Sequence, residues 1–291
     1  MIGKTALYSI RMADGVAACG LCPHRCRVAP GKTGLCHVRR NIDGALIAET
    51  YGRPAAVHVD PIEKKPLAWY LPGSTTFSIG TYGCNFSCAF CQNYGLSRNG
   101  YGAGPEPAFT EPAEIITLAK QHGCRSVAFT YNEPTMFIEY MLDIARLAKA
   151  AGLGTVLVSN GYISPEPRAD LYPLIDAANI DIKGFSETFY STLCGARLAP
   201  VLESCRYYKR DVGGHLEVTN LLIPNRNDSP EMLDALLDWI AVELGADTPI
   251  HFSAYFPTGG FSEPPTPATT VYRAAALAAK RGFTRVKTGN I

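Results

Sequence analysis

Three cysteines lie within eight residues of this 291-residue chain, in the stretch GTYGCNFSCAFCQN (80–93). Cys84, Cys88 and Cys91 follow FSIGTYG (77–83), a short apolar run that predicts a buried strand. A structural zinc ion takes four ligands and a disulfide takes two cysteines, so three thiols suit neither by themselves. Three thiolates can instead hold three irons of a 4Fe–4S cluster, which normally has four such ligands. The fourth iron is then open to another ligand.

Two other kinds of site use the same residues. A zinc ion could take a distant fourth ligand, and Cys88-Ala89-Phe90-Cys91 could form a redox pair. Neither explains why all three cysteines gather directly after one strand. Around a cluster, Gly83 would let the backbone turn tightly and Phe90 would shield one side from water.

A second group of four cysteines lies near the N-terminus, at Cys19, Cys22, Cys26 and Cys36. Four thiols complete the ligand set of a structural zinc ion or of a closed iron–sulfur cluster, and their spacing does not choose between the two. His24 and His37 are spare ligands close by. We expect the scattered cysteines to pack in apolar surroundings; they are Cys124, Cys194 and Cys205.

The composition favours metal ligation over disulfide pairing for these cysteines. Apolar residues make up 47% of the chain, the formal net charge is +1, and no run of like charges indicates a nucleic-acid or anionic membrane partner. The first fifteen residues show no cleavage-site pattern, and no stretch approaches the roughly 20 apolar residues that span a bilayer. We therefore expect a cytoplasmic protein without nucleic-acid or membrane partners, whose cysteines bind metal or react.

Beyond residue 76 the pattern alternates between strands and helices. Strands are predicted at 77–83, 126–132, 154–160, 178–184, 215–223 and 249–256, with a further one at 285–290. A helical pattern follows each of the first six, as over Thr135–Ala151, and Ser229-Pro230 and Thr266-Pro267 are typical helix starts. This alternation predicts a parallel sheet, in a partial (β/α)6 TIM-like or full β/α barrel. A doubly wound open sheet is the alternative.

Polar side chains recur at the C-terminal ends of the predicted strands. They are Cys84, Asn132, Glu133, Ser159, Asn160, Asp181, Lys183 and Tyr255. In a β/α barrel these ends converge on one mouth, which holds the active site. Polar residues often occur at strand ends, which would explain one strand of this kind. Five such strands in succession are better explained by a shared active-site mouth, so the barrel is favoured.

Residues 1–76 are expected to form a cysteine-rich extension that packs on a barrel of residues 77–291. Within the extension, DGALIAETYGRP (43–54) predicts a hairpin or strand pair. The Pro-punctuated segment VDPIEKKPLAWYLPG (59–73) predicts a stretch of chain lying across the barrel.

Several longer motifs accompany the cysteines. They are CGLCPHRC…GKTGLC (19–36), DPIEKKPLAWYLPGS (60–74), FTYNEPT (129–135), SNGYI (159–163), NIDIKGF (179–185), EVTNLLIPNRND (217–228) and HFSAYFP (251–257). CxxxCxxC with an aromatic residue before its last cysteine, directly after a first barrel strand, resembles the radical S-adenosylmethionine (SAM) superfamily. The longer motifs are similar to the AmmeMemoRadiSam-system radical SAM enzymes, relatives of pyruvate formate-lyase activating enzyme. The resemblance covers essentially the whole chain.

This resemblance implies an oxidoreductase- or transferase-type enzyme with a 4Fe–4S cluster on Cys84, Cys88 and Cys91 and SAM on its open iron. An electron donor such as a flavodoxin or ferredoxin would reduce the cluster. SAM would then split into methionine and a 5′-deoxyadenosyl radical, which abstracts a hydrogen atom from a protein or a small molecule. The cofactors carry this chemistry and the protein positions them.

The resemblance also implies roles for individual residues. Glu133 stands where the family often places an acid that meets the methionine amino group, although the glycines of that motif are absent. The alternative is an acid that stabilises a helix N-terminus. Ser159 and Asn160 match a Thr-Asn pair at the ribose and cation end of the site. Asp181 and Lys183 match a DxK on the fourth strand, where both would enter the barrel and pair beside a zwitterionic ligand. A purely structural ion pair is the alternative.

At three positions the sequence departs from the activating enzymes. Thr219 replaces an arginine on the fifth strand, and Phe256, beside the candidate cofactor ligand Tyr255, replaces a histidine on the sixth. Val158 replaces the acid before the Thr-Asn pair. The SAM site is therefore not a close copy, and the substrate can differ.

Three functions remain to be compared. The first is an enzyme that makes a 5′-deoxyadenosyl radical, with activation of a glycyl radical enzyme as one version. The second is a non-catalytic iron–sulfur electron carrier, which needs neither an open iron nor a ring of polar strand ends. The third is a thiol-based regulator, which needs an exposed cysteine of lowered pKa.

Overall fold

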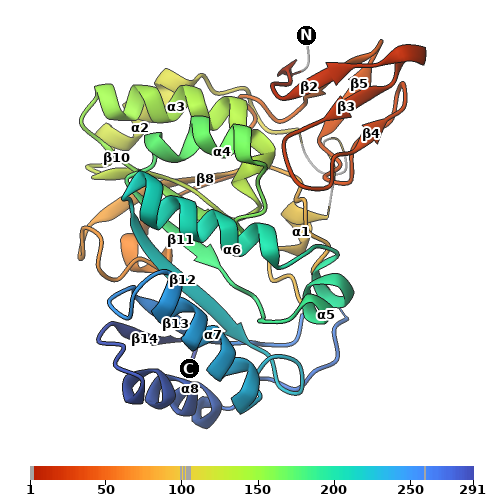
Figure 1. The fold of residues 1–291 in the computed structure, drawn as a ribbon. Helices are drawn as coiled ribbons and strands as arrows, with labels where there is room; N and C mark the ends of the chain where they lie inside the picture. The colour runs from red at the N-terminus through yellow and green to blue at the C-terminus, as the bar shows by residue number, and fades with distance from the viewer. Residues whose placement is uncertain (1–2, 99, 101, 103–105, 259) are drawn as a thin grey trace.

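A sheet of eight strands forms the centre of the computed structural model, which describes residues 3–98, 100, 102, 106–258 and 260–291. Along the sheet the strands lie in the order β14-β13-β12-β11-β10-β9-β8-β7 (Figure 1). Their bounds are β7 (Ala56–Pro61), β8 (Thr75–Gly80), β9 (Ser126–Phe129), β10 (Gly154–Ser159), β11 (Ala177–Asp181), β12 (His215–Leu222), β13 (Ile250–Ala254) and β14 (Val286–Gly289). Strands β8 to β14 are parallel, and β7 pairs antiparallel with β8.

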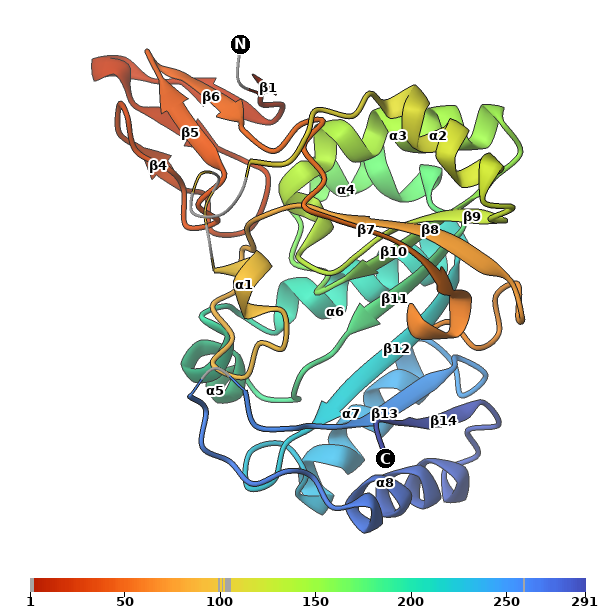
Figure 2. The ribbon, with the colours of Figure 1, turned by 180° about the vertical axis from the view of Figure 1, so that it is seen from behind.

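Helical segments connect successive parallel strands and lie on one side of the curved sheet (Figures 1 and 2). The α-helices are α1 (Tyr94–Ser97), α2 (Pro112–Gln121), α3 (Ile138–Ala150), α4 (Pro165–Leu171), α5 (Glu187–Phe189), α6 (Ala199–Arg206), α7 (Pro230–Glu243) and α8 (Ala268–Lys280). Shorter 3₁₀ or π turns are η2 (Ile62–Lys64), η3 (Pro134–Phe137), η4 (Tyr172–Leu174), η5 (Tyr190–Cys194) and η6 (Tyr207–Val212). Within the described residues, no helix is long and apolar enough to cross a bilayer.

The strand order confirms the predicted partial β/α barrel. Neighbours in the sheet are also neighbours in the chain, so every crossover has the same sense and the helices share one side. A doubly wound sheet would instead reverse its order at a switch point. The further strand predicted at 285–290 is β14. Strand β9 is buried along its whole length, as expected for a parallel strand covered on both faces.

Some strands end earlier than the sequence predicts. Strand β9 stops at Phe129, three residues early, because Tyr131 has a left-handed φ of 74° that breaks the extended backbone. Strands β11 and β13 also end early, at Asp181 and Ala254. Lys183 and Tyr255 therefore lie just beyond these strands rather than within them. All these residues still lie at the C-terminal rim of the sheet.

The predicted helix starts are confirmed at one position and shifted at another. Ser229 caps α7, and its side chain accepts a hydrogen bond from the Met232 N–H at 3.2 Å. Helix α8 begins at Ala268, with Pro267 as its N-cap residue instead of its first helical residue. The helix predicted over 135–151 is η3 followed by α3.

The N-terminal part of the chain forms two small sheets at one end of the barrel (red in Figure 1). One has the order β1-β6-β5 and the other β2-β3-β4, with bounds β1 (Lys4–Thr5), β2 (Ser9–Arg11), η1 (Ala13–Gly15), β3 (Ala17–Cys19), β4 (Arg27–Val28), β5 (Arg39–Ile42) and β6 (Ala45–Ala48). The predicted hairpin is β5–β6, turning at Asp43 and Gly44, which both have positive φ. Its first strand precedes the predicted segment 43–54. The division at residue 76 stays a prediction, and β7, which precedes it, belongs to the large sheet.

A buried ion pair fastens these small sheets to the barrel. Arg39 of β5 lies 2.7 Å from Glu139 of α3, and both side chains are 1% exposed. The guanidinium also donates to the Leu7 carbonyl, and Glu139 accepts the Leu7 N–H. Because removing one member of a buried pair strands the other charge, the docking of the extension depends strongly on this contact.

The segment after β7 lies across the barrel, as predicted for residues 59–73, and it does so at the N-terminal end of the strands. Its residues Ile62 and Leu67 pack against strands β9, β10 and β11, at Ala128, Val156 and Ala177. The carboxylate of Glu217 is 0% exposed and holds this segment in place. It accepts hydrogen bonds from two backbone N–H groups of the segment and contacts two histidine rings; these partners are Ala68, Trp69, His215 and His251.

We predict that Glu217→Gln destabilises the fold in a pH-dependent way. Burial by itself raises the pKa of Glu217, but its four hydrogen-bond partners outweigh burial and lower it from 4.5 to about 2. That shift corresponds to about 3 kcal/mol of unfolding free energy at neutral pH. The contribution is complete above the unfolded-state pKa, near 4.5, and is lost as the pH falls toward 2.

Chemical denaturation of the wild type and Glu217→Gln between pH 7 and pH 3 tests this prediction. The gap in unfolding free energy should narrow below about pH 4.5. Glu231→Gln, which removes an exposed carboxylate from α7, is the control and should leave unfolding nearly unchanged. A gap that stays constant with pH would contradict the proposed role of the Glu217 charge.

Candidate active site at the mouth of the barrel

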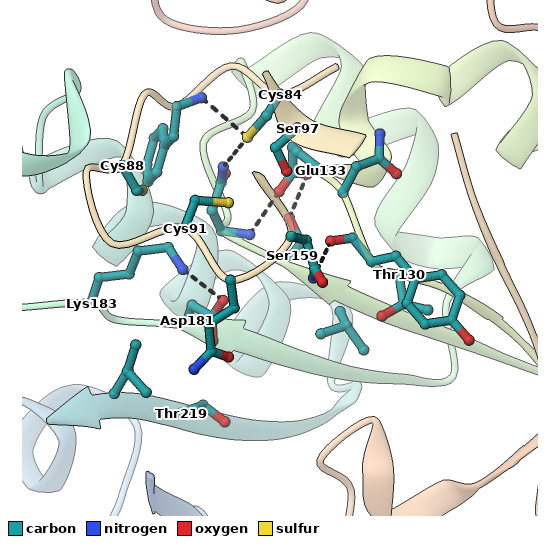
Figure 3. A pocket seen from close by; sticks show the side chains of 18 of the residues that line it. Cys84, Cys88, Cys91, Ser97, Thr130, Glu133, Ser159, Asp181, Lys183 and Thr219 are labelled. Carbon is teal, nitrogen blue, oxygen red and sulfur yellow. Dashed lines mark hydrogen bonds and ion pairs between the residues drawn. The ribbon is translucent and has the colours of Figure 1, made fainter. Parts of the chain in front are cut away.

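The C-terminal ends of all seven parallel strands line one pocket of about 240 Å³ (Figure 3). The loop after β8 supplies the three cysteines, and β9 to β14 or the residues just after them supply the other walls. The lining includes Cys84, Cys88, Cys91, Thr130, Glu133, Ser159, Asn160, Asp181, Lys183, Thr219, Ser253 and Asn290. The structure therefore brings together every predicted cofactor or cluster residue of the barrel except Tyr255.

Tyr255 is buried beside the pocket without lining it. Its hydroxyl donates to the Phe261 carbonyl at 3.0 Å, and its N–H donates to Thr266. These contacts hold the loop after β13. The structure thus gives Tyr255 a packing position and no direct contact with the pocket.

The cysteine loop is held in place by backbone contacts on three sides. Asn132 donates to the Gly83 carbonyl at 2.8 Å, and the N–H groups of Ser87 and Ala89 donate to the carbonyls of the turn η5. Gly83 has a φ of 89°, and a Cβ there would lie 2.6 Å from the Cys36 carbonyl oxygen. The tight turn predicted at Gly83 is confirmed, and glycine is required both by the angle and by the close approach.

The three thiols fit a cluster better than a single ion. Within the described part of the chain, no three His, Cys, Asp or Glu side chains converge as the ligands of one metal ion would. In a 4Fe–4S cluster each thiolate holds a different iron, so the sulfurs surround a volume and need not meet at one point. Cys84, Cys88 and Cys91 line one wall of the pocket without meeting at one point (Figure 3).

A buried hydroxyl on the opposite wall lacks a partner. Thr219 of β12 is 8% exposed and lines the pocket, and its Oγ1 has no hydrogen-bond partner among the described residues. A polar atom of this kind is costly unless a bound group satisfies it. The pocket therefore suits a polar ligand that reaches from the cysteines to β12.

Glu133 holds the ends of two strands together. One carboxylate oxygen accepts the Thr135 N–H and hydroxyl and the Ser159 hydroxyl, and the other accepts the Asn160 N–H at 2.8 Å. Burial raises the pKa of Glu133, while these hydrogen bonds act to lower it. A carboxylate has about four lone-pair sites, and the oxygen that faces Asn160 keeps one for a ligand. The predicted contact with the methionine amino group stays a prediction.

Asn160 connects this network to the cluster loop. Its amide donates to the Asn85 Oδ1 at 2.8 Å and lies 3.9 Å from the Cys84 sulfur. Burial raises the pKa of the Cys84 thiol, and the Glu133 carboxylate raises it further. Metal binding must therefore displace a proton at Cys84.

Asp181 and Lys183 form an ion pair at the lower wall of the pocket (Figure 3), with 2.9 Å between Nζ and Oδ2. The side chains are 31% and 19% exposed, so the pair faces the pocket and is only partly desolvated. Burial acts to lower the pKa of Lys183, but the charges of Asp181 and the Cys88 thiolate raise it well above its usual value. Lys183 therefore places a fixed positive charge beside the cysteines.

Cys194 has a contact that its sequence position does not predict. It is buried, as expected, but its thiol is hydrogen-bonded to the Cys88 sulfur, which lowers the pKa of Cys88 and raises that of Cys194. Arg98 also supports the loop by donating to the Cys88 carbonyl at 3.0 Å. No spacing pattern links Cys194 to residues a hundred positions earlier, so this contact emerges only from the fold.

Comparisons with known proteins agree with this site. The sequence pattern of the Radical SAM superfamily matches residues 78–240. An uncharacterized protein of Methanocaldococcus jannaschii is 39% identical over 99% of this chain and 85% of its own length. A pyruvate formate-lyase-activating enzyme of Listeria monocytogenes is 26% identical over 56% of this chain and 68% of its own length.

A solved structure shares the fold. Streptococcus suis SuiB bound to S-adenosylmethionine superimposes with a TM-score of 0.56 at 15% identity, over 72% of this chain and 49% of SuiB. The chain belongs to the radical SAM superfamily, whose enzymes use a 4Fe–4S cluster and SAM. The narrower resemblance to the AmmeMemoRadiSam group stays a prediction.

We predict that Asp181→Asn weakens SAM binding while the cluster stays intact. The substitution keeps the side-chain shape and removes the charge that pairs with Lys183. Because the pair is partly exposed, we expect the binding free energy of SAM to weaken by about 1–2 kcal/mol, which is roughly a five- to thirtyfold loss of affinity. Calorimetric titration of SAM into the reconstituted variant measures this loss.

Asp176→Asn is the matched control for this experiment. Asp176 precedes β11 at its other end and forms an ion pair of similar exposure with Lys149 at 2.7 Å, away from the pocket. Because Asp176 also accepts hydrogen bonds from the Thr155 N–H and hydroxyl, Asp176→Asn should lower stability at least as much as Asp181→Asn while leaving SAM affinity unchanged. Normal affinity in Asp181→Asn with a lowered melting temperature would show that the Asp181–Lys183 pair is only structural.

Proposed function

We propose that the protein cleaves SAM reductively and uses the resulting 5′-deoxyadenosyl radical to abstract a hydrogen atom from a substrate. The observation that carries this proposal is that three thiols line a pocket to which every parallel strand contributes. A 4Fe–4S cluster on these thiols would supply one electron to SAM, which divides into methionine and the radical. Taking up a hydrogen atom converts the radical to 5′-deoxyadenosine.

The side chains of the pocket suit the parts of SAM. Lys183 and Asp181 present both charges to the zwitterionic methionine end. The free hydroxyl of Thr219 offers a hydrogen bond deeper in the pocket. Ser159 and Asn160, held by Glu133, would order the ribose end. The positions of these residues and the family of the chain support these roles.

An electron donor and a substrate complete the proposal. The donor would be a small one-electron protein such as a flavodoxin or ferredoxin, because the reaction takes electrons singly. The similarity to pyruvate formate-lyase-activating enzymes supports a protein substrate, with a glycine of a glycyl radical enzyme as the specific candidate. The departures at Thr219, Phe256 and Val158 leave a small-molecule substrate as the alternative outcome of the test.

The competing functions fit the pocket less well. An electron carrier needs no cavity of about 240 Å³ beside its cluster and no unpaired hydroxyl in its wall. A thiol-based regulator needs an accessible cysteine, whereas Cys124, Cys194 and Cys205, the cysteines outside the two groups, are all buried. Both alternatives predict that SAM remains uncleaved.

We predict that the anaerobic, reduced protein converts SAM to 5′-deoxyadenosine and that Cys84→Ala/Cys88→Ala/Cys91→Ala abolishes this conversion. The triple variant should also lose about four irons, one cluster's worth. Mass spectrometry and iron analysis measure both quantities. Cys124→Ala removes a buried cysteine outside the pocket and is the control, with expected full activity.

Two results would count against the proposal. Cleavage of SAM by the triple variant would show that the chemistry lies elsewhere, and absence of cleavage by the wild type with an intact cluster would favour an electron carrier. Adding a candidate glycyl radical enzyme and recording its electron paramagnetic resonance (EPR) spectrum tests the substrate. A protein-based glycyl signal supports the protein target, and its absence alongside turnover of a small molecule rejects it.

A further inference from the structure

The four N-terminal cysteines gather around one pocket that is separate from the SAM pocket. Cys19 ends β3, Cys26 precedes β4, and Cys22 and Cys36 lie in the loops between the short strands. Their thiols share this pocket with the apolar side chains of Leu21, Val28 and Met136. All four are free of disulfides, so the fold gathers four buried or half-buried thiols without joining them.

Backbone N–H groups point at these sulfurs. The N–H of His24 donates to the Cys22 sulfur, and those of Val38 and Arg39 donate to the Cys36 sulfur. The turns that aim these groups need left-handed φ values of 49° at Arg25 and 65° at His37. Burial raises the pKa of the Cys22 and Cys36 thiols, and these hydrogen bonds act in the opposite direction. Donors aimed at the sulfurs suit metal-bound cysteines, because apolar packing of thiols requires none.

A buried positive charge with free donors adjoins the same pocket. Arg39 is 1% exposed, lines the pocket, and interacts electrostatically with Cys19 and Cys36. Its Nη2 bonds to Glu139 and Leu7, but Nε and Nη1 have no hydrogen-bond partner among the described residues. Unpaired donors at such depth are costly and indicate an anionic group nearby. Four thiolates around a metal centre carry that negative charge.

The arrangement of the thiols distinguishes between zinc and an iron–sulfur cluster. A structural zinc ion draws its four ligands to one point at about 2.3 Å from sulfur. In the described chain no three His, Cys, Asp or Glu side chains converge in that way, although all four thiols line one pocket. Cys84, Cys88 and Cys91, the cluster ligands proposed for the barrel, have the same property. The N-terminal thiols therefore match a cluster and not a single ion.

The nearby histidines are not required as ligands. His24 Nε2 is 2.7 Å from the Asn85 carbonyl oxygen, where it is occupied by a hydrogen bond. His37 is exposed on the outer side of the loop. Four thiolates then complete the ligand set, and the centre would have no open position for a substrate, in contrast to the cysteines of the barrel.

We propose that Cys19, Cys22, Cys26 and Cys36 hold a second, closed iron–sulfur cluster. It would lie between the surface, where Leu35 is 62% exposed, and the loop that carries Cys84. Asn85 contacts both sides, since it lines the N-terminal pocket and accepts a hydrogen bond from Asn160. The proposal concerns the metal content of the extension and does not depend on SAM cleavage.

Metal and sulfide analysis of the full chain, purified without oxygen, tests the proposal. The decisive sample is Cys84→Ala/Cys88→Ala/Cys91→Ala, because it leaves the extension unaltered. It should retain two to four irons per chain, about as many inorganic sulfides, and an EPR signal on reduction. Cys22→Ser/Cys26→Ser should lose this portion of the iron, while Cys124→Ser/Cys205→Ser, buried outside both groups, should lose none.

The possible results separate cleanly. One zinc per chain in the triple variant, without iron or sulfide, would overturn the proposal in favour of a structural zinc site. No metal at all in that variant would also overturn it. If Cys22→Ser/Cys26→Ser fails to fold, the triple variant alone still decides. Retained iron in the triple variant with no SAM cleavage by the wild type would support the second cluster and refute the proposed reaction.

Discussion

Parallel strands laid side by side in chain order place every C-terminal strand end on the same rim, and the site depends on this constraint. Seven short segments that are up to two hundred residues apart contribute side chains to one pocket for this reason alone. The segment after β7, which Glu217 holds in place, covers the N-terminal end of the barrel. The pocket lies at the C-terminal rim, beside the cysteine loop.

The second feature of the structure is a positively charged side chain beside each group of cysteines. Thiolates are costly in an apolar interior, and each cysteine group has a buried or half-buried cation beside it. Lys183 adjoins Cys88 in the barrel, and Arg39 adjoins Cys36 in the extension. Each cation is in turn held by a carboxylate, Asp181 or Glu139. The two cysteine groups thus have the same electrostatic arrangement in different parts of the chain.

Much of the architecture could be predicted because it is encoded locally. Strand and helix periodicity and helix caps such as Ser229 are short-range patterns, and the structure confirms them. Contacts between distant residues could not be predicted in the same way. The Cys194–Cys88 hydrogen bond and the Arg39–Glu139 pair join positions about a hundred residues apart, and no local pattern marks either one. Tyr255 shows the reverse case, since its motif position suggested a ligand but its hydroxyl turns to Phe261.

Three thiolates are expected to leave one iron of the cluster open to SAM, and spectroscopy of the reduced cluster tests this most directly. The protein would be reduced without oxygen and mixed with SAM that carries ¹⁵N in its methionine amino group. Pulsed EPR should then detect a ¹⁵N hyperfine coupling to the cluster bound at Cys84, Cys88 and Cys91. An unchanged spectrum with no ¹⁵N coupling, in protein that retains this cluster, would show that no iron is open to SAM and would contradict the account.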